Sequence, residues 1–405
     1  MPRKPSTIPA GVRIADKLTV GEIVRVFPRD KVEQILLETG RETKRIRELP
    51  NDVVIYFAVM QGLYRNVSST EVLRIMAESL HWLFGDTEFT ITGKSGISQA
   101  RSRVGFEPHE ILFRECAKPL ADQSTIGAYY RQWRLTALDG SLFNVEDTDE
   151  NANFFKRSKN QSGSSAYPKA KVVSLMEIGT RACFDLAIGT YKDSELTLAE
   201  KTIVSLKPDM LCLADRLFMS FDLFVAAART GAALVWRTKI DRTFTLEDQQ
   251  AGYTSDGPIK RLPDGSFIAT IYSFKDRKKE RGIKVRVIEY DAVGSTTGEL
   301  IRLFTNILDP LAAPAEELAQ LYHQRWEIET MLDEVKTHLG VDVIHSRTPK
   351  LVKQELYGVF MAHYVTRAVM HAAAKRQKID PDELSFVHSV RVLRRAITSF
   401  GSFPP

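Results

Sequence analysis

The stretch RLTALDGSLFNV, residues 134–145, marks the point at which the sequence changes from one kind of secondary structure to another. Its residues alternate around a short apolar run, which is typical of a β-strand. Asp139 follows the apolar run directly and precedes Gly140. Asp-Gly is common in turns, so Asp139 is either a turn residue or a carboxylate presented at the end of a strand. Both interpretations stay open on this segment alone.

Downstream of this stretch the sequence predicts alternating strands and helices. The predicted strands are 172–179, 182–189, 210–215 and 233–238, with a turn at Thr180-Arg181, and the predicted helices are 195–206 and about 220–230. The strand MLCLAD is fully apolar, as in a buried parallel strand, and it ends on Asp215. Asp215 is either an N-cap of the next helix or a second strand-end carboxylate. This order of elements predicts an α/β sheet that is covered on both faces.

Upstream, residues from about 14 to 125 carry apolar positions at helical spacing. The predicted helices lie in the segments 32–40, 53–64, 69–84 and 108–122. Gly40 follows the first of these like a C-cap, and Ser69 precedes another like an N-cap. A shorter piece, 92–106, bears Gln99, Arg101 and Arg103. It is either a DNA-contacting helix, as in helix-turn-helix units, or an exposed helix end.

Beyond residue 240 the sequence first favours strands and then helices. Strands are predicted at 266–274, 284–290 and 301–308, and helices at 314–340, 352–377 and 382–400. We therefore expect three domains: an N-terminal helical domain, an α/β domain with a β-rich insertion, and a C-terminal helical region. Their expected bounds are 1–130, 131–345 (insertion 240–300) and 346–405.

Composition fits an ordinary globular protein, with 43% hydrophobic and 26% charged residues in 405. No apolar run approaches the length of about 18 residues that a membrane helix needs, and the N-terminus lacks a signal-peptide pattern. We therefore expect a cytosolic protein without a membrane partner. The three cysteines, Cys116, Cys183 and Cys212, are widely spaced. Such sparse spacing argues against a disulfide framework and a structural zinc site.

The net charge of +5 and the isoelectric point of about 8.9 favour a polyanionic partner only mildly. Basic residues cluster at 41–48, 156–161 and 275–284. A single cluster of this kind is more often a solvated face than a binding patch. Three of them in one chain make nucleic acid a serious candidate partner.

The segment LYHQRWEIETMLDEVKTHLG, residues 321–340, is predicted to be helical. At about 100° per residue, Tyr322, Arg325, Glu329 and Lys336 share one narrow face. That face borders the apolar stripe of the helix, which consists of Leu321, Ile328, Leu332, Val335 and Leu339. One alternative is a solvated helix stabilised by pairs such as Arg325–Glu329.

The other alternative is that this helix completes a metal site. Asp139, Asp215 and Glu329 together are a plausible cage for hard divalent cations, because Mg²⁺ prefers a few carboxylates plus water and phosphate oxygens. Two such ions activate a water or a 3′-hydroxyl and stabilise the leaving oxygen of a phosphodiester. Arg325 and Lys336 would then hold phosphate oxygens near the scissile bond.

The spacing Tyr322-x2-Arg325-x3-Glu329-x6-Lys336 resembles the YREK signature of the DDE transposases of insertion-sequence family four. The blocks ALDGSLFNVEDTDEN and LADRLFMSFDLFVAAARTGAALVWR resemble the two aspartate blocks of the family, and ISQARSRVG and DPDELSFVHSVRVLRRA resemble recurrent terminal pieces. The resemblance implies a ribonuclease-H-like core with a β-strand insertion. It assigns Asp139, Asp215 and Glu329 to catalysis and metal binding, and Tyr322, Arg325, Trp326 and Lys336 to DNA.

The implied activity is cut-and-paste transposition with two Mg²⁺ ions, for which Mn²⁺ is expected to substitute. The enzyme would bind terminal inverted repeats and target DNA as a homodimer on the nucleoid, with no small-molecule substrate. Cleavage is expected to pass through a DNA hairpin. Many relatives carry a further basic tail, whereas this sequence ends at SFGSFPP. The alternatives are therefore a catalytically silent, truncated or domesticated transposase that acts as a DNA-binding repressor, or a nuclease without strand transfer.

Overall fold

The computed structural model describes most of the chain. The described residues are 20–44, 49–84, 92–160, 163–238, 253–254, 257–258, 261–273, 276, 278, 281–291 and 300–399. The ends of the expected terminal domains, part of each basic cluster and part of the segment 240–300 lie outside these residues.

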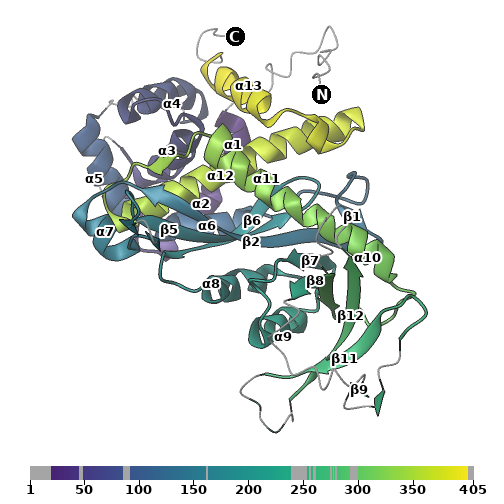
Figure 1. Ribbon diagram of the computed structural model, residues 1–405. Helices are drawn as coiled ribbons and strands as arrows, with labels where there is room; N and C mark the ends of the chain where they lie inside the picture. The colour runs from purple at the N-terminus through teal and green to yellow at the C-terminus, as the bar shows by residue number, and fades with distance from the viewer. Residues whose placement is uncertain are drawn as a thin grey trace.

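The centre of the molecule is one mixed sheet (Figure 1). Its strands run in the order β11-β12-β13-β8-β7-β2-β5-β6. Their bounds are β2 Trp133–Val145, β5 Lys169–Glu177, β6 Ala182–Thr190, β7 Met210–Ala214, β8 Ala233–Thr238, β11 Phe267–Ile271, β12 Ile283–Asp291 and β13 Leu300–Thr305. The strands β2, β5 and β6 alternate in direction, each antiparallel to the next, whereas β7 and β8 run parallel to β2. Three antiparallel strands followed by two parallel ones on the other side of β2 form a ribonuclease-H-like core, as the sequence predicted.

Two short strands extend this sheet at β2, and two small hairpins lie outside it. Tyr129–Tyr130 (β1) pairs antiparallel and Val343–Ile344 (β14) pairs parallel with β2. The hairpins are formed by β3 (Lys159–Asn160) with β4 (Gly163–Ser164) and by β9 (Tyr253–Thr254) with β10 (Gly257–Pro258). The strands β11 and β12 continue the central sheet through β13 and β8, so this part of the segment 240–300 is built onto the core.

The alternative of a turn at Asp139-Gly140 is wrong. The ladder between β2 and β5 runs without interruption from Thr136 to Asn144 and pairs Asp139 with Ser174. Glycine is needed here for another reason, because a Cβ atom on Gly140 would lie 3.1 Å from the carboxyl carbon of Glu195. The Asp-Gly pair thus allows a close approach across the sheet surface instead of reversing the chain.

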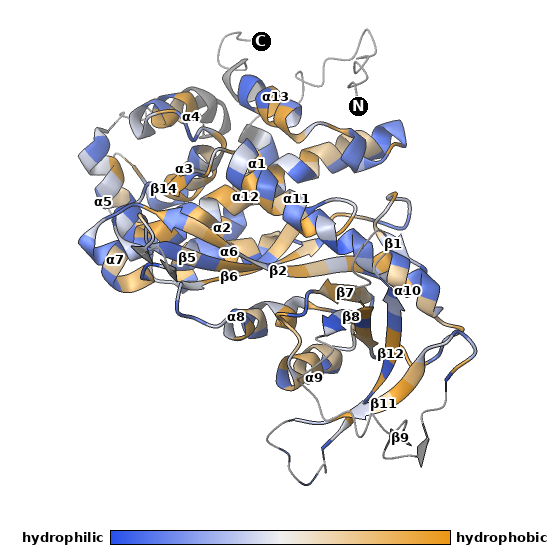
Figure 2. Cartoon of the chain, in the orientation of Figure 1, coloured by the Kyte–Doolittle hydropathy of each residue, from blue (hydrophilic) through white to orange (hydrophobic). Residues whose placement is uncertain are grey.

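Helices cover both faces of the sheet, as the order of elements predicted (Figure 1). On one face lie α8 (Glu195–Thr202) with its 3₁₀ extension Ile203–Ser205 and α9 (Phe221–Arg229). The other face is covered by the long helix α12 (Pro349–Gln377), which packs closely on α3. Hydrophobic residues concentrate on the strands and on the helices α3 and α12 (Figure 2). Each face therefore has its own apolar core, and successive residues of a strand point alternately into one or the other.

Apart from the helical run 315–338, the remaining helices lie mainly on the α12 side of the sheet. They are α1 (Val20–Val26), α2 (Arg29–Glu38), α3 (Asn51–Leu63), α4 (Ser69–Phe84), α5 (Lys94–Val104), α6 (Glu107–Cys116), α7 (Asp149–Phe155), the 3₁₀ turn Pro381–Glu383 and α13 (Phe386–Ser399). Gly40 has a φ of +64° and ends α2 as predicted. The predicted cap Ser69 is wrong by one residue, because the Ser68 hydroxyl accepts the Glu71 amide at 3.3 Å. None of the described helices is long and apolar enough to span a bilayer.

The two arginines of α5 contact other elements of the fold. Arg101 donates to Gln354 and Ser346, each at 2.9 Å, and Arg103 donates to Asn51 at 2.8 Å. Only Gln99 of the three predicted residues is exposed. The arginines connect α5 to α3 and α12, so the alternative of an exposed helix end is wrong for these two side chains, and contact of α5 with DNA stays a prediction.

Candidate active site

Strand register brings the two aspartates to neighbouring positions. Leu138 pairs with Ala214 in the parallel ladder of β2 and β7, so Asp139 and Asp215 each follow a paired residue. Neighbouring strands lie about 4.8 Å apart. Leu138 and Ala214 belong to the core beneath α8 and α9, which directs the next residue of β2, Asp139, to the opposite face. The helix cap of α9 is Ser220, so Asp215 is not that cap.

The glutamate arrives on an irregular helical run. It comprises α10 (Ala315–Tyr322), a 3₁₀ turn (His323–Trp326), α11 (Glu327–Asp333) and a π-helical turn (Glu334–His338). The predicted helix is therefore present but not uniformly α-helical, and π-turns inside helices are frequent at functional sites. The predicted apolar stripe from Leu321 to Leu339 is buried throughout.

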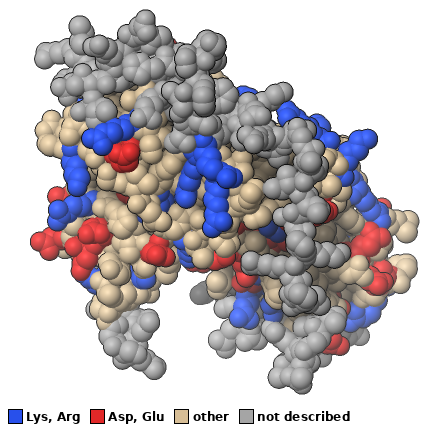
Figure 3. All heavy atoms as spheres, turned by 90° about the horizontal axis from the view of Figure 1, so that it is seen from above, with Lys and Arg blue, Asp and Glu red and all other residues tan. Residues whose placement is uncertain are grey.

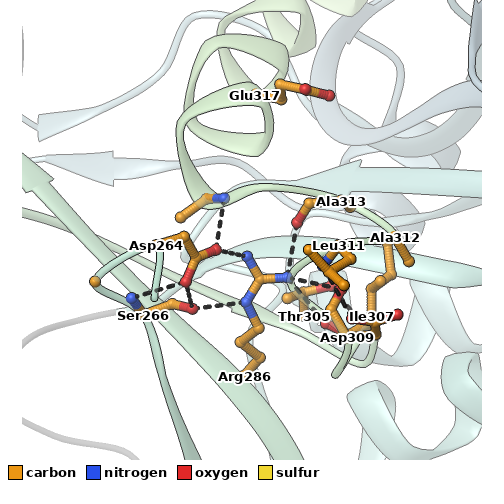
Figure 4. Close-up of polar contacts among 12 residues, drawn as sticks. Asp264, Ser266, Arg286, Thr305, Ile307, Asp309, Leu311, Ala312, Ala313 and Glu317 are labelled. Carbon is orange, nitrogen blue, oxygen red and sulfur yellow. Dashed lines mark hydrogen bonds and ion pairs between the residues drawn. The ribbon is translucent and has the colours of Figure 1, made fainter. Parts of the chain in front are cut away.

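An arginine from the sheet fixes the start of this run (Figure 4). Arg286 of β12 is fully buried and donates to the Ala313 carbonyl at 2.7 Å and to Asp264 at 2.5 Å. The same Asp264 oxygen accepts the amide of Ala315, the first residue of α10, at 2.9 Å. Since the carboxylate is shared by the arginine and the helix end, β12 sets where the helical run begins.

Arg325 connects two of the predicted carboxylates. Its guanidinium lies 3.4 Å from Asp139 Oδ2 and 2.8 Å from Glu329 Oε1. The Asp139 side chain is 20% exposed, and its Oδ1 accepts the Gly140 amide at 2.8 Å. The Glu329 side chain is 55% exposed. The i,i+4 pair Arg325–Glu329 that a solvated helix would show is therefore present. Its arginine, however, is buried and also contacts Asp139 of β2.

Both other carboxylates contribute to the electrostatic environment of Asp139. Burial, together with the negative charges of Glu329 and Asp215, raises the pKa of Asp139 to about 6 against the opposite effects of the Gly140 amide and Arg325. Raised carboxyl pKa values of this kind are common in functional sites. A cation bound here would favour the ionised form of Asp139 and so lower its pKa.

The other residues of the predicted signature occupy three different environments. Tyr322 is buried and donates to the Ala214 carbonyl at 3.4 Å, and burial raises its pKa well above the ordinary value. Lys336 Nζ lies 5.2 Å from the ring centre of Phe143, and burial followed by repulsion from Lys169 lowers the pKa of Lys336. Trp326 is 66% exposed. The run therefore presents one indole and one partly buried ammonium beside the carboxylates.

The donor set fits a hard divalent cation in its chemistry. Carboxylate oxygens of Asp139, Asp215 and Glu329 are the ligands that Mg²⁺ prefers. Ser174, the ladder partner of Asp139, has a buried hydroxyl without a hydrogen-bond partner among the described residues. Within that part of the chain, however, no three Asp, Glu, His or Cys side chains are arranged as a metal cluster. Arg325 contacts both Asp139 and Glu329 instead.

One candidate site residue escaped the sequence analysis. Trp236 pairs with Ala214 in the parallel ladder of β7 and β8, so Arg237 takes on β8 the position that Asp215 takes after β7. Its positive charge opposes the effect of burial on the pKa of Tyr322. The sequence signal was present, since an arginine ends an otherwise apolar strand, but only the register shows that it lies beside an aspartate.

Positive charge on the molecular surface is divided. On the face seen in Figure 3, Lys and Arg side chains form separate groups with Asp and Glu among them. A net charge of +5 is therefore not gathered on this face into one patch, and DNA contacts must be sought residue by residue.

Comparison with known proteins agrees with this fold and site. Residues 17–114 match the family model of the insertion element 4 transposase N-terminal region, and residues 132–365 match that of the transposase DDE domain. The second match covers more than half of the chain, so the chain belongs to the DDE transposases. It is the transposase of an insertion sequence, an enzyme of a class that cleaves DNA, transfers strands and depends on divalent metal ions. The predicted family and enzyme class are confirmed.

Comparison with individual relatives shows which transposases the chain is similar to. The chain is 28% identical over 384 residues to transposase InsG for insertion sequence element IS4 of Escherichia coli (strain K12), covering 92% of this chain and 82% of that protein. It is also 28% identical over 239 residues to putative transposase InsZ of the same organism, covering 58% of this chain and 77% of that protein. A piggyBac transposase in a synaptic complex with hairpin DNA shares the fold, with a TM-score of 0.52 and 11% identity over 96% of this chain and 82% of that one.

Proposed function

We propose that Asp139, Asp215 and Glu329 are the catalytic carboxylates of this transposase. The observation that supports this most directly is the parallel register of β2 and β7, which makes Asp139 and Asp215 neighbours on the side of the sheet that carries Glu329. The enzyme binds the terminal inverted repeats of its element and cuts them out. A freed 3′-hydroxyl then attacks the opposite strand, which releases the flanking DNA and forms a hairpin. Water opens the hairpin, and the regenerated 3′-hydroxyl is joined to target DNA.

We propose two Mg²⁺ ions as the cofactor, held by these three carboxylates and replaceable by Mn²⁺. When bound, such ions activate the attacking oxygen and stabilise the leaving oxygen of a phosphodiester. Arg325 donates to Asp139 and Glu329 at present. A cation that uses the same oxygens competes with these contacts, so Arg325 becomes available to a DNA phosphate as the metal binds.

The remaining signature residues are proposed to contact DNA. Lys336 and Arg325 hold phosphate oxygens near the scissile bond. Trp326 is largely exposed beside Arg325, and its indole provides a stacking surface for an unpaired base. Tyr322 fixes the run against β7 through Ala214 and adds a hydroxyl near the DNA. Arg237 adds a further positive charge next to Asp215.

The working unit is proposed to be a homodimer that pairs two element ends in the cytoplasm, on nucleoid DNA. The N-terminal helices to about residue 130 bind DNA, the core to about residue 345 cuts it, and the C-terminal helices serve dimerisation. A catalytically silent transposase that acts only as a DNA-binding repressor is the second candidate, favoured by the contacts of Arg325 with both Asp139 and Glu329.

Metal-dependent nicking of DNA that carries the element ends tests this proposal. The wild type should nick and then join a labelled 3′-hydroxyl end, while Asp139→Asn should bind the same DNA without cutting it. Equal binding with no cutting by either protein would establish the repressor. Cutting without joining would establish a nuclease that lacks strand transfer.

A further inference from the structure

A polar cavity lies away from the carboxylates, where the N-terminal helices meet the start of α12. Its volume is about 270 Å³. The lining includes Arg65, Ser69, Arg101, His345, Ser346 and Glu355. These residues come from the end of α3, from α4, α5 and α12, and from the segment around β14, which Figure 2 labels beside α3 and α5. Neither the transposase signature nor the predicted site uses any of them.

Arg65 provides a buried cationic group with a spare donor. Its side chain is 4% exposed, pairs with Glu355 and donates to the Val343 carbonyl at 2.7 Å. The remaining Nε–H has no hydrogen-bond partner among the described residues. A buried donor without a partner costs about 1–3 kcal/mol, which an acceptor in the cavity would recover.

The other charged groups leave the cavity with a positive excess. Arg101 is a second cation, and Glu355 is the one carboxylate among the lining residues. Glu355 is already occupied, because besides Arg65 it accepts the Ser346 hydroxyl at 2.5 Å and the Ser346 amide at 2.9 Å. Two guanidinium groups against one satisfied carboxylate favour an anion over a cation.

The helix α4 adds to this preference. Ser69 lines the cavity and is the first residue of α4, which runs for 16 residues. The amino end of a helix carries about half a positive charge and exposes amide donors, which suits a phosphate. His345, 68% exposed, stands at the side of the cavity that faces solvent.

The position of the cavity relates it to the active site. The strand β14 pairs with Asn144 and Val145 of β2, and His345 follows it directly. Asn144 lies five positions beyond Asp139, which is about 17 Å along a strand. Between them, Lys336 covers Phe143 and Lys169 pairs with Asn144. About 17 Å is half of the 34 Å turn of duplex DNA.

We propose that this cavity binds a backbone phosphate of the element-end DNA, about half a helical turn from the cleavage position. Arg65 Nε and the amino end of α4 supply the donors, and Arg101, whose Nε and Nη2 donate to Gln354 and Ser346, adds positive charge. The lysines along β2 carry the DNA from the carboxylates to the cavity. The inference rests on the proposed function for the identity of the DNA, but its binding chemistry is independent of the carboxylates.

The sharpest test is Ser69→Glu with Thr70→Glu as its matched control. Both place one carboxylate in the first turn of α4, where a negative charge favours the helix, so both variants should fold. Only Ser69 lines the cavity. We expect Ser69→Glu to weaken binding of element-end DNA about tenfold, and to reduce the slope of log Kd against log salt by about 0.9, the value of one phosphate. Thr70→Glu should change affinity less than about threefold, with an unchanged slope. Equal effects of the two variants would overturn the proposal.

A second arm distinguishes DNA from a free anion. Inorganic phosphate at millimolar concentration is added, and thermal unfolding of the wild type and Ser69→Glu is followed. Stabilisation of the wild type alone, combined with equal DNA binding by the two glutamate variants, would assign the cavity to a free anion and overturn the DNA assignment. If Ser69→Glu loses DNA binding while no variant cleaves, the cavity proposal stands and the proposed catalytic function fails.

Discussion

Two glutamates of the same helical run, five residues apart, have opposite environments. The Glu329 side chain is 55% exposed and forms an ion pair with Arg325 at 2.8 Å. The Glu334 side chain is 4% exposed and lies in a dense network, with His363 at 3.0 Å, Arg181 at 3.4 Å and a close pair with Arg367. The oxygens of Glu329 therefore remain accessible, whereas the carboxylate of Glu334 is enclosed in the fold.

The electrostatics of Glu334 indicate a structural group. Burial alone would raise its pKa, but the hydrogen bond with His363 and the charge of Arg367 keep the pKa of Glu334 below its ordinary value. Arg367 belongs to α12 and Arg181 to the turn between β5 and β6. Glu334 therefore ties the helical run to the rest of the fold, which leaves Glu329 free to act. A fixed support behind a reactive group is what a precise site requires.

The largest effect that follows from this difference concerns activity. Glu329→Gln should lower DNA cleavage by about three orders of magnitude, on the order of 4 kcal/mol of transition-state stabilisation, because the variant loses a metal-binding charge. Thermal unfolding should hardly change, since the side chain is exposed and its ion pair is worth about 1 kcal/mol or less. Cleavage rates at saturating DNA, together with the unfolding midpoint, measure both. Normal turnover in this variant would remove Glu329 from the site.

The second prediction concerns stability. Substitution of Glu334 should destabilise the protein, whereas substitution of Glu329 should not. Glu334→Gln removes the buried carboxylate that pairs with Arg367, while Arg181 keeps Glu327 and Asp382 as partners. The loss of the buried charge pair should cost about 3–5 kcal/mol of unfolding free energy. The matched control is Asp333→Asn, next to it on a side chain that is 57% exposed. The control should change stability by less than about 0.5 kcal/mol. Urea unfolding followed by circular dichroism provides the measurement, and equal destabilisation by both substitutions would contradict the structural role of Glu334.

The contrast also shows what sequence can and cannot provide. The strands around Asp139 and Asp215 follow from apolar runs and alternation, and the sheet was predictable because these patterns are local. The face shared by Arg325 and Glu329 follows from helical periodicity, and their ion pair is present at 2.8 Å. The burial of Glu334 could not be predicted, because its partners lie in distant elements whose packing no local pattern encodes.

The wrong predictions have a common physical origin. Asp139-Gly140 and the arginines of α5 were interpreted from local preference, whereas tertiary contacts decided their roles. Gly140 accommodates the side chain of Glu195, and Arg101 and Arg103 bind groups on α12 and α3. Tertiary context commonly overrides such propensities. The carboxylate trio was inferred from three separate segments, and register alone shows that two of them are neighbours.

The third prediction concerns pH. With a pKa of about 6 in the folded protein against 3.8 for an ordinary aspartate, Asp139 takes up a proton on folding between these values. Its contribution to stability therefore declines as pH rises through this window. Since only the ionised form binds a cation, Mn²⁺ affinity should fall by up to about tenfold per pH unit below 6. Calorimetric titration with Mn²⁺ from pH 5 to 8 tests this, with Asp139→Asn as the variant that lacks this titration. An affinity of the wild type that is constant from pH 5 to 7 would contradict it.

The smallest effect separates a DNA contact on this run from general positive charge. Lys336→Ala should remove one phosphate contact and reduce the slope of log Kd against log salt by about 0.9. The control is Lys207→Ala, an exposed lysine that precedes β7 at the end of the strand opposite to Asp215. It removes the same charge from the chain but lies away from the carboxylates, so its slope should equal that of the wild type. If the two variants shift the slope equally, the ammonium of Lys336 contributes only to the net charge of the protein and holds no phosphate. A difference confined to Lys336 would instead place DNA along the face that carries Glu329, while the side of the run that holds Glu334 stays inside the fold.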